Sequence, residues 1–451
     1  MATPFKIVVL ADFAPGRPAE PPLVLDSGGV DGLMASLSPG LKLGDPLIDA
    51  VFKRLEDFTP PELTKGRKEL EQDPDQLTKV LHHPLFQSME SAWRGLDFLA
   101  RRLPEEGVIL EILNTPADDI RQRFYDHVFL PHYNGETKHP LGQVLLDFDF
   151  DHKPSSLEVL KDLAKMGESL QAPLACQTTA SFFGVGHLLH LAALSGLDQR
   201  LQGPEYTSFL GFREHPEATW LSLLLNRFLL RLPHQFPSYT EPASADKPDT
   251  YLWGKAVWVL GANLARAWGK HAEPAGISGM GEDGQQTGLP TRELPLSRKE
   301  KVETPLEAVL PQPIVEMLPY FGLSPLTQLP MELGTQQPGM VYIHVAVNLR
   351  RFTDPTARQP GLLTVYTTLA YSIILGRASA LAQAALPKLS GTEPQEAADR
   401  LSDILKDELG PMAQGELEVS PVEGALHVRL VPKLLIHSKQ LQIEFDLPFN
   451  G

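Results

Sequence analysis

Cysteine is almost absent from this sequence, which has a single one, Cys176, among 451 residues. A lone thiol cannot form an intrachain disulfide, and it leaves no cysteine pair for a structural zinc site. Cys176 lies in an apolar segment, where a thiol packs as a small hydrophobic group. The shortage of cysteine therefore excludes a disulfide-stapled scaffold and favours a reducing, cytoplasmic location.

The sequence also lacks a long apolar run. An uncharged stretch at residues 359–376 contains Thr, Tyr and Ser and falls short of the roughly 20 mainly apolar residues that a transmembrane helix needs. The first residues, MATPFKIVVLADF, have neither the basic region nor the long apolar stretch of a secretory signal. We therefore expect no direct membrane insertion.

Basic residues are in the minority, because 40 Lys and Arg stand against 56 Asp and Glu and leave a formal charge of −16. Nucleic-acid binding draws on clusters of Lys and Arg, so we expect no nucleic-acid partner. The same charge makes copies of the chain repel one another, and a homo-oligomer must offset that repulsion by burying surface. Hydrophobic residues, at 42%, are numerous enough for a sizeable core.

The N-terminal hundred residues predict two strands and a helix. Apolar runs at 5–10 and 50–55 are typical of short strands. Residues 57–75 are charged and contain three prolines, so we interpret them as a join between two parts of the chain. Apolar residues then recur every three or four positions over 84–103, which predicts a helix that begins at a proline and is stopped by the next one.

The middle of the chain predicts a βαβ unit. Residues 144–150 and 174–178 are typical strands, and Ser155 with Glu158 forms a capping box that would begin a helix between them. A connection of this kind makes the two strands parallel. We expect the following region, 182–232, to be mostly helical, including its strongly apolar end.

The last part of the chain changes in character. Three stretches rich in Pro, Gly or charge predict surface loops, at 233–250, 272–301 and 353–360. A long buried helix is expected at 362–386, and antiparallel strands are expected at 416–419, 425–431 and 439–447, the last with strictly alternating apolar and polar residues. The fold class predicted is mixed α/β (α+β), with βαβ elements followed by a C-terminal antiparallel sheet.

Three carboxylates are the strongest candidates for chemistry. Asp147, Asp149 and Asp151 alternate along a predicted strand, so their side chains share one face. Carboxylates at a strand end can hold Mg²⁺, which keeps a metal-dependent enzyme as an alternative. A solvated strand face is the simpler interpretation, because no second cluster of carboxylates or histidines stands near them in the sequence.

A glycine-rich motif lacks the context that its chemistry requires. Residues 279–284 match G-x-G-x-x-G, but prolines flank the motif and Glu282 and Asp283 would repel a phosphate. We interpret it as a surface loop.

Two histidine pairs are the remaining candidates for metal ligands. His82 with His83 and His187 with His190 have no third zinc ligand at a typical spacing, which favours structural roles. The sequence therefore predicts no catalytic, cofactor-binding or metal-ligating residue, no cofactor and no enzyme. A long apolar chain without such a site suits a protein that contacts copies of itself.

Several short motifs resemble one family. HHPLFQ at 82–87, followed by ESAWRGL at 90–96, resembles the start of the core of TssC, the large contractile-sheath subunit of type VI secretion systems. Further segments resemble the family in the same order, and they are LDFDF at 146–150, FRE at 212–214, RFLLRLP at 227–233 and YLWG at 251–254. The family has Asn where this chain has Lys255. This resemblance covers residues 80–447.

The first part of the chain resembles the small sheath subunit, TssB. PFKIVVLADF at 4–13 and LEDFTPP at 55–61 are similar to two of its motifs, so that residues 3–70 look like a small subunit fused to a large one. The expected organisation is a small-subunit-like segment at 1–75, a large-subunit-like core at 76–350, and a C-terminal helix with antiparallel strands at 351–451.

The resemblance implies a structural subunit rather than an enzyme. It implies that copies form a ring or helical sheath around an inner tube in a type VI-like contractile machine, with an inner-tube protein and baseplate components as further partners. The family's ATPase-binding helix has no counterpart at the 57–80 join, which makes binding of the unfoldase ATPase doubtful. The same departure keeps a non-contractile ring or a baseplate-associated adaptor as an alternative.

Overall fold

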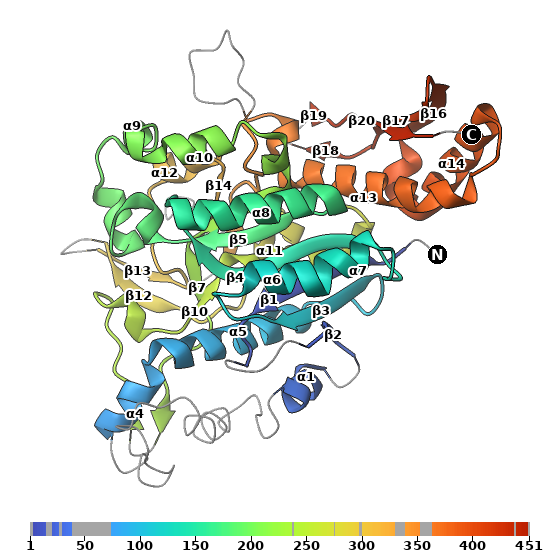
Figure 1. The fold of residues 1–451 in the computed structure, drawn as a ribbon. Helices are drawn as coiled ribbons and strands as arrows, with labels where there is room; N and C mark the ends of the chain where they lie inside the picture. The colour runs from blue at the N-terminus through green and yellow to red at the C-terminus, as the bar shows by residue number, and fades with distance from the viewer. Residues whose placement is uncertain are drawn as a thin grey trace.

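A large mixed sheet forms the centre of the protein in a computed structural model (Figure 1). The structure describes residues 3–14, 20–26, 29–37, 74–236, 239–274, 276–296, 300–329, 339–351, 363–436 and 439–449. The nine strands are ordered β11-β15-β14-β6-β5-β4-β1-β3-β2. Their bounds are β1 (Phe5–Ala11), β2 (Leu23–Val24), β3 (Val108–Asn114), β4 (Leu141–Phe150), β5 (Leu174–Thr178), β6 (Leu221–Leu225), β11 (Gln285–Gln286), β14 (Leu323–Thr327) and β15 (Val341–Ile343).

The most N-terminal strand lies in the interior of this sheet. β1 pairs in parallel with β3 on one side and with β4 on the other, and all seven of its residues are buried. β5, β6 and β14 continue the parallel part, whereas β2, β11 and β15 pair antiparallel towards the edges. Parallel strands covered on both faces read as continuous apolar runs, which is why β1 could be predicted from its sequence.

Helices cover both faces of the sheet and produce two cores. On one face, Phe5, Ile7 and Val9 of β1 belong to a core with α5 (Pro84–Ala100), α11 (Ala256–His271) and α13 (Leu369–Ala385). On the other face, Val8 and Leu10 belong to a core with a helical layer. This second layer contains α6 (Ile120–Phe124), the π-helical turn η2 (Tyr125–Phe129), α7 (Leu130–Tyr133) and α8 (Pro154–Leu170).

Shorter elements surround these three layers. The other α-helices of the described residues are α1 (Gly29–Leu37), α4 (Pro74–Leu81), α9 (Leu197–Arg200), α10 (Thr207–Phe212), α12 (Gln312–Met317) and α14 (Pro394–Leu409). The short 3₁₀ turns are η3 (Ala180–Phe183), η4 (Leu188–Ala193), η5 (Pro204–Tyr206), η6 (Pro216–Trp220), η7 (Pro248–Thr250), η8 (Glu282–Gly284), η9 (Leu318–Phe321), η11 (Val365–Thr367), η12 (Leu386–Lys388) and η13 (Gly410–Gln414). Two-stranded ladders pair β7 (Arg227–Leu229) with β10 (Trp253–Lys255), β8 (Gln235–Phe236) with β9 (Tyr239–Thr240), β12 (Arg292–Pro295) with β13 (Lys301–Thr304), and β18 (Leu435–Ile436) with β19 (Lys439–Gln440).

The C-terminal part forms a separate antiparallel sheet beside α13 and α14 (Figure 1). β16 (Glu416–Val422), β17 (Ala425–Val431) and β20 (Ile443–Pro448) pair in that order. Leu441, Ile443 and Leu447 are buried, and the polar residues between them are exposed. The predicted alternation is therefore confirmed, and so is the mixed α/β fold class with its C-terminal antiparallel sheet. The single strand expected at 439–447 is divided, however, into β19, which pairs with β18, and β20, which pairs with β17.

The structure corrects five of the expected features. The apolar end of region 182–232 forms strands β6 and β7 rather than helix. Pro154 occupies the first position of α8 and Lys153 precedes it without a side-chain cap, so the expected capping box at Ser155 does not form. The expected helix at 362–386 begins only at Leu369, and the expected loops at 233–250 and 272–301 contain short strands. The predicted strand at 50–55, the predicted loop at 353–360 and nearly all of the 57–75 join lie outside the described residues.

Helix α13 and the residues that follow it are unusually apolar. Within the described ranges, residues Leu369–Lys388 are long and apolar enough to cross a membrane, but 67% of the most apolar window is buried inside the protein. Ile373, Ile374 and Ala378 contribute to the first core. This helix is therefore buried to the degree expected of a helix in a protein core.

Close packing of α5 on α11 depends on Gly95. A Cβ atom at this position would lie 2.3 Å from Cε2 of Trp258. We expect Gly95→Ala to lower the free energy of unfolding by about 1–3 kcal/mol, because α5 and α11 must separate to accept the methyl group. Urea denaturation measures this change. Gly211→Ala is the matched control, since the same atom there meets nothing within 4 Å, and equal stabilities of the two variants would contradict the prediction.

Candidate functional site

A cavity of about 520 Å³ opens where the central strands end. Its lining includes Asp12 directly after β1, Asp118 after β3, Asp147 and Asp149 at the end of β4, and Lys255 just before α11. β3 and β4 lie on opposite sides of β1, so the strand order across the sheet changes direction at β1. Open α/β sheets bind ligands in the crevice outside the carboxyl ends of strands at such a reversal. The cavity is therefore the candidate site.

The three predicted carboxylates have different surroundings. Asp147 is buried, and its Oδ1 accepts a hydrogen bond of 3.1 Å from Trp258 Nε1 and lies 3.5 Å from Lys255 Nζ. Burial raises the pKa of Asp147 to about 6, although Lys255 opposes the rise. Asp149 is exposed, and Asp151 accepts a hydrogen bond of 3.0 Å from the backbone N–H of Lys153 before α8. The expected solvated face thus holds for Asp149 and is wrong for Asp147.

These carboxylates do not converge on a metal position. Within the described part of the chain, no group of three or more His, Cys, Asp and Glu side chains could hold a metal ion. A β-bulge-like register shift between Leu146 and Asp149 separates the residues that the sequence placed on one regular face.

Three residues of the site were missed by sequence reasoning, and they are Asp12, Asp118 and Lys255. Burial, and then the nearby Asp118 carboxylate, raise the pKa of Asp12 to about 6. Its position directly after an apolar strand was the available signal, because strand ends in α/β folds carry functional groups. Lys255 had no such signal, since its partner Asp147 lies more than 100 residues away in the sequence.

The raised pKa of Asp12 predicts how the stability depends on pH. In the folded state the pKa of Asp12 is about 6, whereas the pKa of Asp in an unfolded chain is about 3.9. Between these values the folded state binds more protons, so the contribution of Asp12 to stability falls as the pH rises. We expect Asp12→Asn to be more stable than the wild type at pH 8, with an advantage that shrinks towards pH 4.

Urea denaturation across this pH range tests the prediction. Asp246→Asn, in an exposed turn, is the control and should leave the pH profile of the wild type unchanged. If the stability profiles of Asp12→Asn and the wild type superimpose, the ionised Asp12 carboxylate does not destabilise the folded state and the prediction is wrong.

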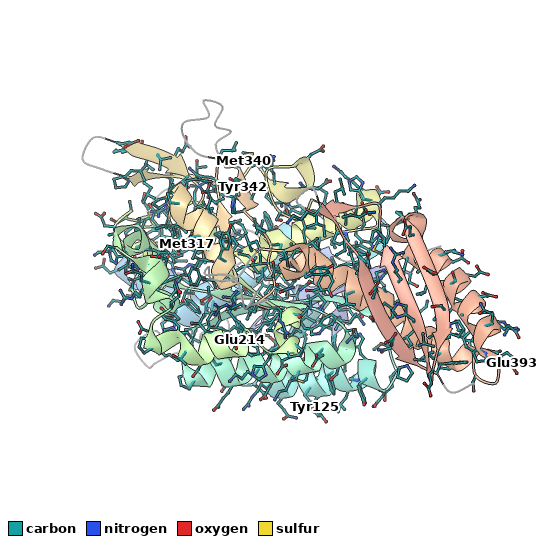
Figure 2. The ribbon with its side chains drawn as sticks, turned by 90° about the horizontal axis from the view of Figure 1, so that it is seen from above. Tyr125, Glu214, Met317, Met340, Tyr342 and Glu393 are labelled. Carbon is teal, nitrogen blue, oxygen red and sulfur yellow. The ribbon has the colours of Figure 1, made fainter. Side chains whose placement is uncertain are left out.

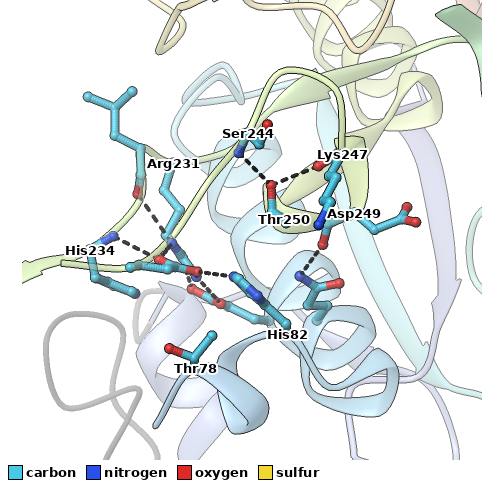
Figure 3. Close-up of polar contacts among 12 residues, drawn as sticks. Thr78, His82, Arg231, His234, Ser244, Lys247, Asp249 and Thr250 are labelled. Carbon is cyan, nitrogen blue, oxygen red and sulfur yellow. Dashed lines mark hydrogen bonds and ion pairs between the residues drawn. The ribbon is translucent and has the colours of Figure 1, made fainter. Parts of the chain in front are cut away.

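A buried group of charges ties α5 to the segment after β7 (Figure 3). The Arg231 guanidinium donates to Glu90 at 2.7 and 3.0 Å and to Glu241 at 2.6 Å. Glu90 is 1% exposed and also accepts a hydrogen bond of 2.7 Å from Arg94. Burial alone would raise the pKa of Glu90, but Arg231 and Arg94 hold it below its usual value. We call Glu90, Arg231 and Glu241 the buried charge network.

One of the predicted structural histidines borders the buried charge network. His82 Nε2 lies 3.3 Å from Glu241 Oε1, and the backbone N–H of His234 donates to Glu241 at 2.8 Å (Figure 3). Burial would raise the pKa of Glu241, but His82 and Arg231 lower it to about 2. His187 and His190 lie with ring centroids 5.8 Å apart, outside any metal-binding group of the described residues.

The glycine motif and the cysteine occupy the surroundings that the sequence predicted. Residues 279–284 follow α11, contain only the 3₁₀ turn η8 and lead into β11, so no α-helix starts there, and Asp283 pairs with Lys270 at 2.9 Å. Asn263 donates hydrogen bonds to the carbonyls of Ile277 and Gly284, which fixes the loop on α11. Cys176 is fully buried in β5, and burial raises the pKa of its thiol.

Comparisons with known proteins indicate the class of the protein. The family model VipB, described as the EvpB/VC_A0108 tail sheath N-terminal domain, matches residues 70–332. The type VI secretion system sheath protein TssC1 of Pseudomonas aeruginosa is 25% identical over 244 residues, which cover 49% of this chain and 48% of that protein. A crystal structure of a sheath tail protein from Desulfitobacterium hafniense is 10% identical and covers 65% of this chain and 60% of its own, with a TM-score of 0.30.

The class is therefore that of tail-sheath proteins, because the family model spans more than half of the chain. The chain belongs to the VipB family of type VI secretion sheath proteins. Proteins of this family are structural rather than enzymes, which confirms the expectation of a non-enzymatic protein. The chain spans about half the length of the curated relative that it matches, and the family match begins at residue 70.

Proposed function

We propose that this protein is a structural subunit of a type VI-secretion-like contractile machine in the cytoplasm, where copies assemble into rings or a helical tube around an inner tube. The observation that carries the proposal is the sheath-family match across residues 70–332. The TssC1 relative is itself named as a sheath protein. An inner-tube protein and baseplate components would be the further partners of such an assembly.

The same proposal includes a TssB-like N-terminal segment, residues 3–70, fused to the TssC-like part. Its support is the position of β1, which pairs with β3 and β4 through residues distant in the sequence. If the small subunit were a separate chain, its first strand would occupy the position of β1 between β3 and β4. Fusion would fix the ratio of the two parts at one to one and raise their effective concentration to roughly the millimolar range.

The C-terminal sheet offers a surface for contact between copies. β16 and β20 form its two edges, and no other described strand pairs with them. An edge strand presents unpaired N–H and C=O groups that can add a strand from another chain. Charged side chains such as Glu418, Arg429 and Glu444 lie on its exposed face and would set which partner strand is accepted.

Negative-stain electron microscopy of the purified protein, with its mass from light scattering, tests the assembly. Rings, tubes or cogwheel particles of many copies are expected. A monomer of 49.7 kDa that stays monomeric at all concentrations would contradict self-assembly and favour the alternative, a baseplate-associated adaptor that needs a partner.

A further inference from the structure

A groove runs between the helical segment 120–133 and α8. It consists of the cavity at the carboxyl ends of β1 and β4 and a second cavity of about 620 Å³. Asp118 and Arg121 line both cavities, so the two adjoin. α6 and α8 lie next to each other on the same face of the sheet (Figure 1). We call these two joined cavities the helix-pair groove.

The groove carries an excess of negative charge. Three cationic side chains line it, against six carboxylates, which are those of Asp12, Asp118, Asp119, Asp147, Asp149 and Asp162. Two of the cations already have partners, because Lys255 lies 3.5 Å from Asp147 and Arg121 lies 2.9 Å from Asp162. Asp119 is also paired, with Arg123 at 2.7 Å, so the carboxylates without an ion pair among the described residues are those of Asp12, Asp118 and Asp149. Asp12 Oδ1 is buried without a hydrogen-bond partner among the described residues. The groove therefore has acceptors to spare and few donors.

The outer end of the groove is aromatic. Tyr125 lines the second cavity and stacks on Phe129, which stacks on Tyr133, with ring centroids 5.5 and 5.3 Å apart. Tyr125 is 41% and Tyr133 65% exposed. Figure 2 shows Tyr125 at the edge of the molecule. Exposed aromatic rings attract Lys and Arg through their faces and are enriched at protein interfaces.

We propose that the helix-pair groove is a docking site for an extended segment of a partner protein that carries arginine or lysine side chains. A guanidinium entering the groove can donate to Asp118 and Asp149 and can compete for Asp162, whose exposed pair with Arg121 contributes little stability. The aromatic end holds a second cationic or apolar side chain of the same segment. Binding of such a segment does not require self-assembly of the protein, so the peptide measurements test the groove independently of the sheath function.

Fluorescence anisotropy with a labelled seven-residue peptide of alternating arginine and leucine tests this site on the full-length protein. A matched peptide with citrulline in place of each arginine keeps the shape and removes the charge. We expect the arginine peptide to bind about tenfold more tightly, and we expect added salt to weaken its binding. Equal affinities for the two peptides would overturn the proposal.

Variants then locate the binding. The double variant Asp118→Asn with Asp149→Asn should weaken the arginine peptide about tenfold, because both side chains are exposed and lose only their charge. Asp399→Asn with Asp403→Asn, on the exposed face of α14, is the matched control. Tyr125→Ala should weaken binding about threefold, whereas Tyr320→Ala, with a side chain equally exposed at 40%, should not. Unchanged binding in the double variant would overturn the assignment.

A second copy of this chain is the competing occupant. If the Asp118→Asn and Asp149→Asn variant changed the particle mass of the protein alone, a copy would occupy the groove and the proposal of a separate basic partner would be wrong. An unchanged mass together with weakened peptide binding is the expected result.

Discussion

Replacing Arg231 with methionine is expected to lower the free energy of unfolding by about 3–5 kcal/mol, because it leaves two buried carboxylates without their shared partner. Glu90 is 1% and Glu241 4% exposed, and Arg231 donates to both. Arg94 still pairs with Glu90, and His82 still lies near Glu241. These neighbours reduce the loss of stability, but neither replaces a guanidinium that forms hydrogen bonds with both carboxylates.

Chemical denaturation of two further variants separates charge from packing. Arg101→Met removes a pair with Asp97 in which the arginine is 72% exposed, and we expect a loss of at most about 0.5 kcal/mol. Arg231→Met combined with Glu90→Gln and Glu241→Gln removes the unpaired charges and should recover part of the stability. A triple variant less stable than Arg231→Met would show that the carboxylates are not the source of the loss.

The same network predicts a response to acid. Partners hold the pKa of Glu90 below its usual value and that of Glu241 at about 2. A carboxylate with a lowered pKa contributes stability above its unfolded pKa, near 4.3, and loses that contribution as the pH falls towards the folded value. The wild type should therefore lose more stability than Arg231→Met between about pH 5 and pH 2. Parallel pH profiles would contradict this account.

Elements with a clear period or a clear boundary were predictable from the sequence. β1 is an unbroken apolar run, α5 has an apolar stripe begun by Pro84, and β20 alternates strictly. The apolar run over β6 and β7 has no period, and such a run fits a buried helix as well as a buried strand, so the helical prediction was wrong there. Pro154 begins α8 before Ser155 can act as its cap.

The candidate site was less predictable, because its members meet only in the fold. Asp12 and Asp118 are separated by more than 100 residues, and so are Asp147 and Lys255. The sequence placed Asp147, Asp149 and Asp151 on one strand face, but Asp147 turns to Trp258 of α11 and Asp151 to the start of α8. Charge pairs of this kind depend on which helices cover the sheet, which no local pattern specifies.

Separating the chain into residues 1–70 and 76–451 is expected to abolish folding of the larger piece alone. That piece lacks β1, whose seven residues are all buried between β3 and β4. Burying one large apolar side chain contributes about 1.5–3 kcal/mol, and β1 buries five of them, at Phe5, Ile7, Val8, Val9 and Leu10. Their sum is comparable to the whole net stability of a domain, about 5–15 kcal/mol. Circular dichroism and thermal unfolding of the piece measure the loss.

Co-expression of the two pieces should restore a stable complex, because the cores on both faces of the sheet require only that β1 occupies its place, not that it is covalently joined. Affinity purification through a tag on residues 1–70 should recover residues 76–451 in equal amount. The same fragment with Val9→Asp is the control, since a carboxylate would enter the core beneath α5 and α11 and the larger piece should not be recovered. Folding of residues 76–451 alone, or failure of the wild-type pieces to associate, would mean that the N-terminal segment is not a fused subunit that completes the sheet.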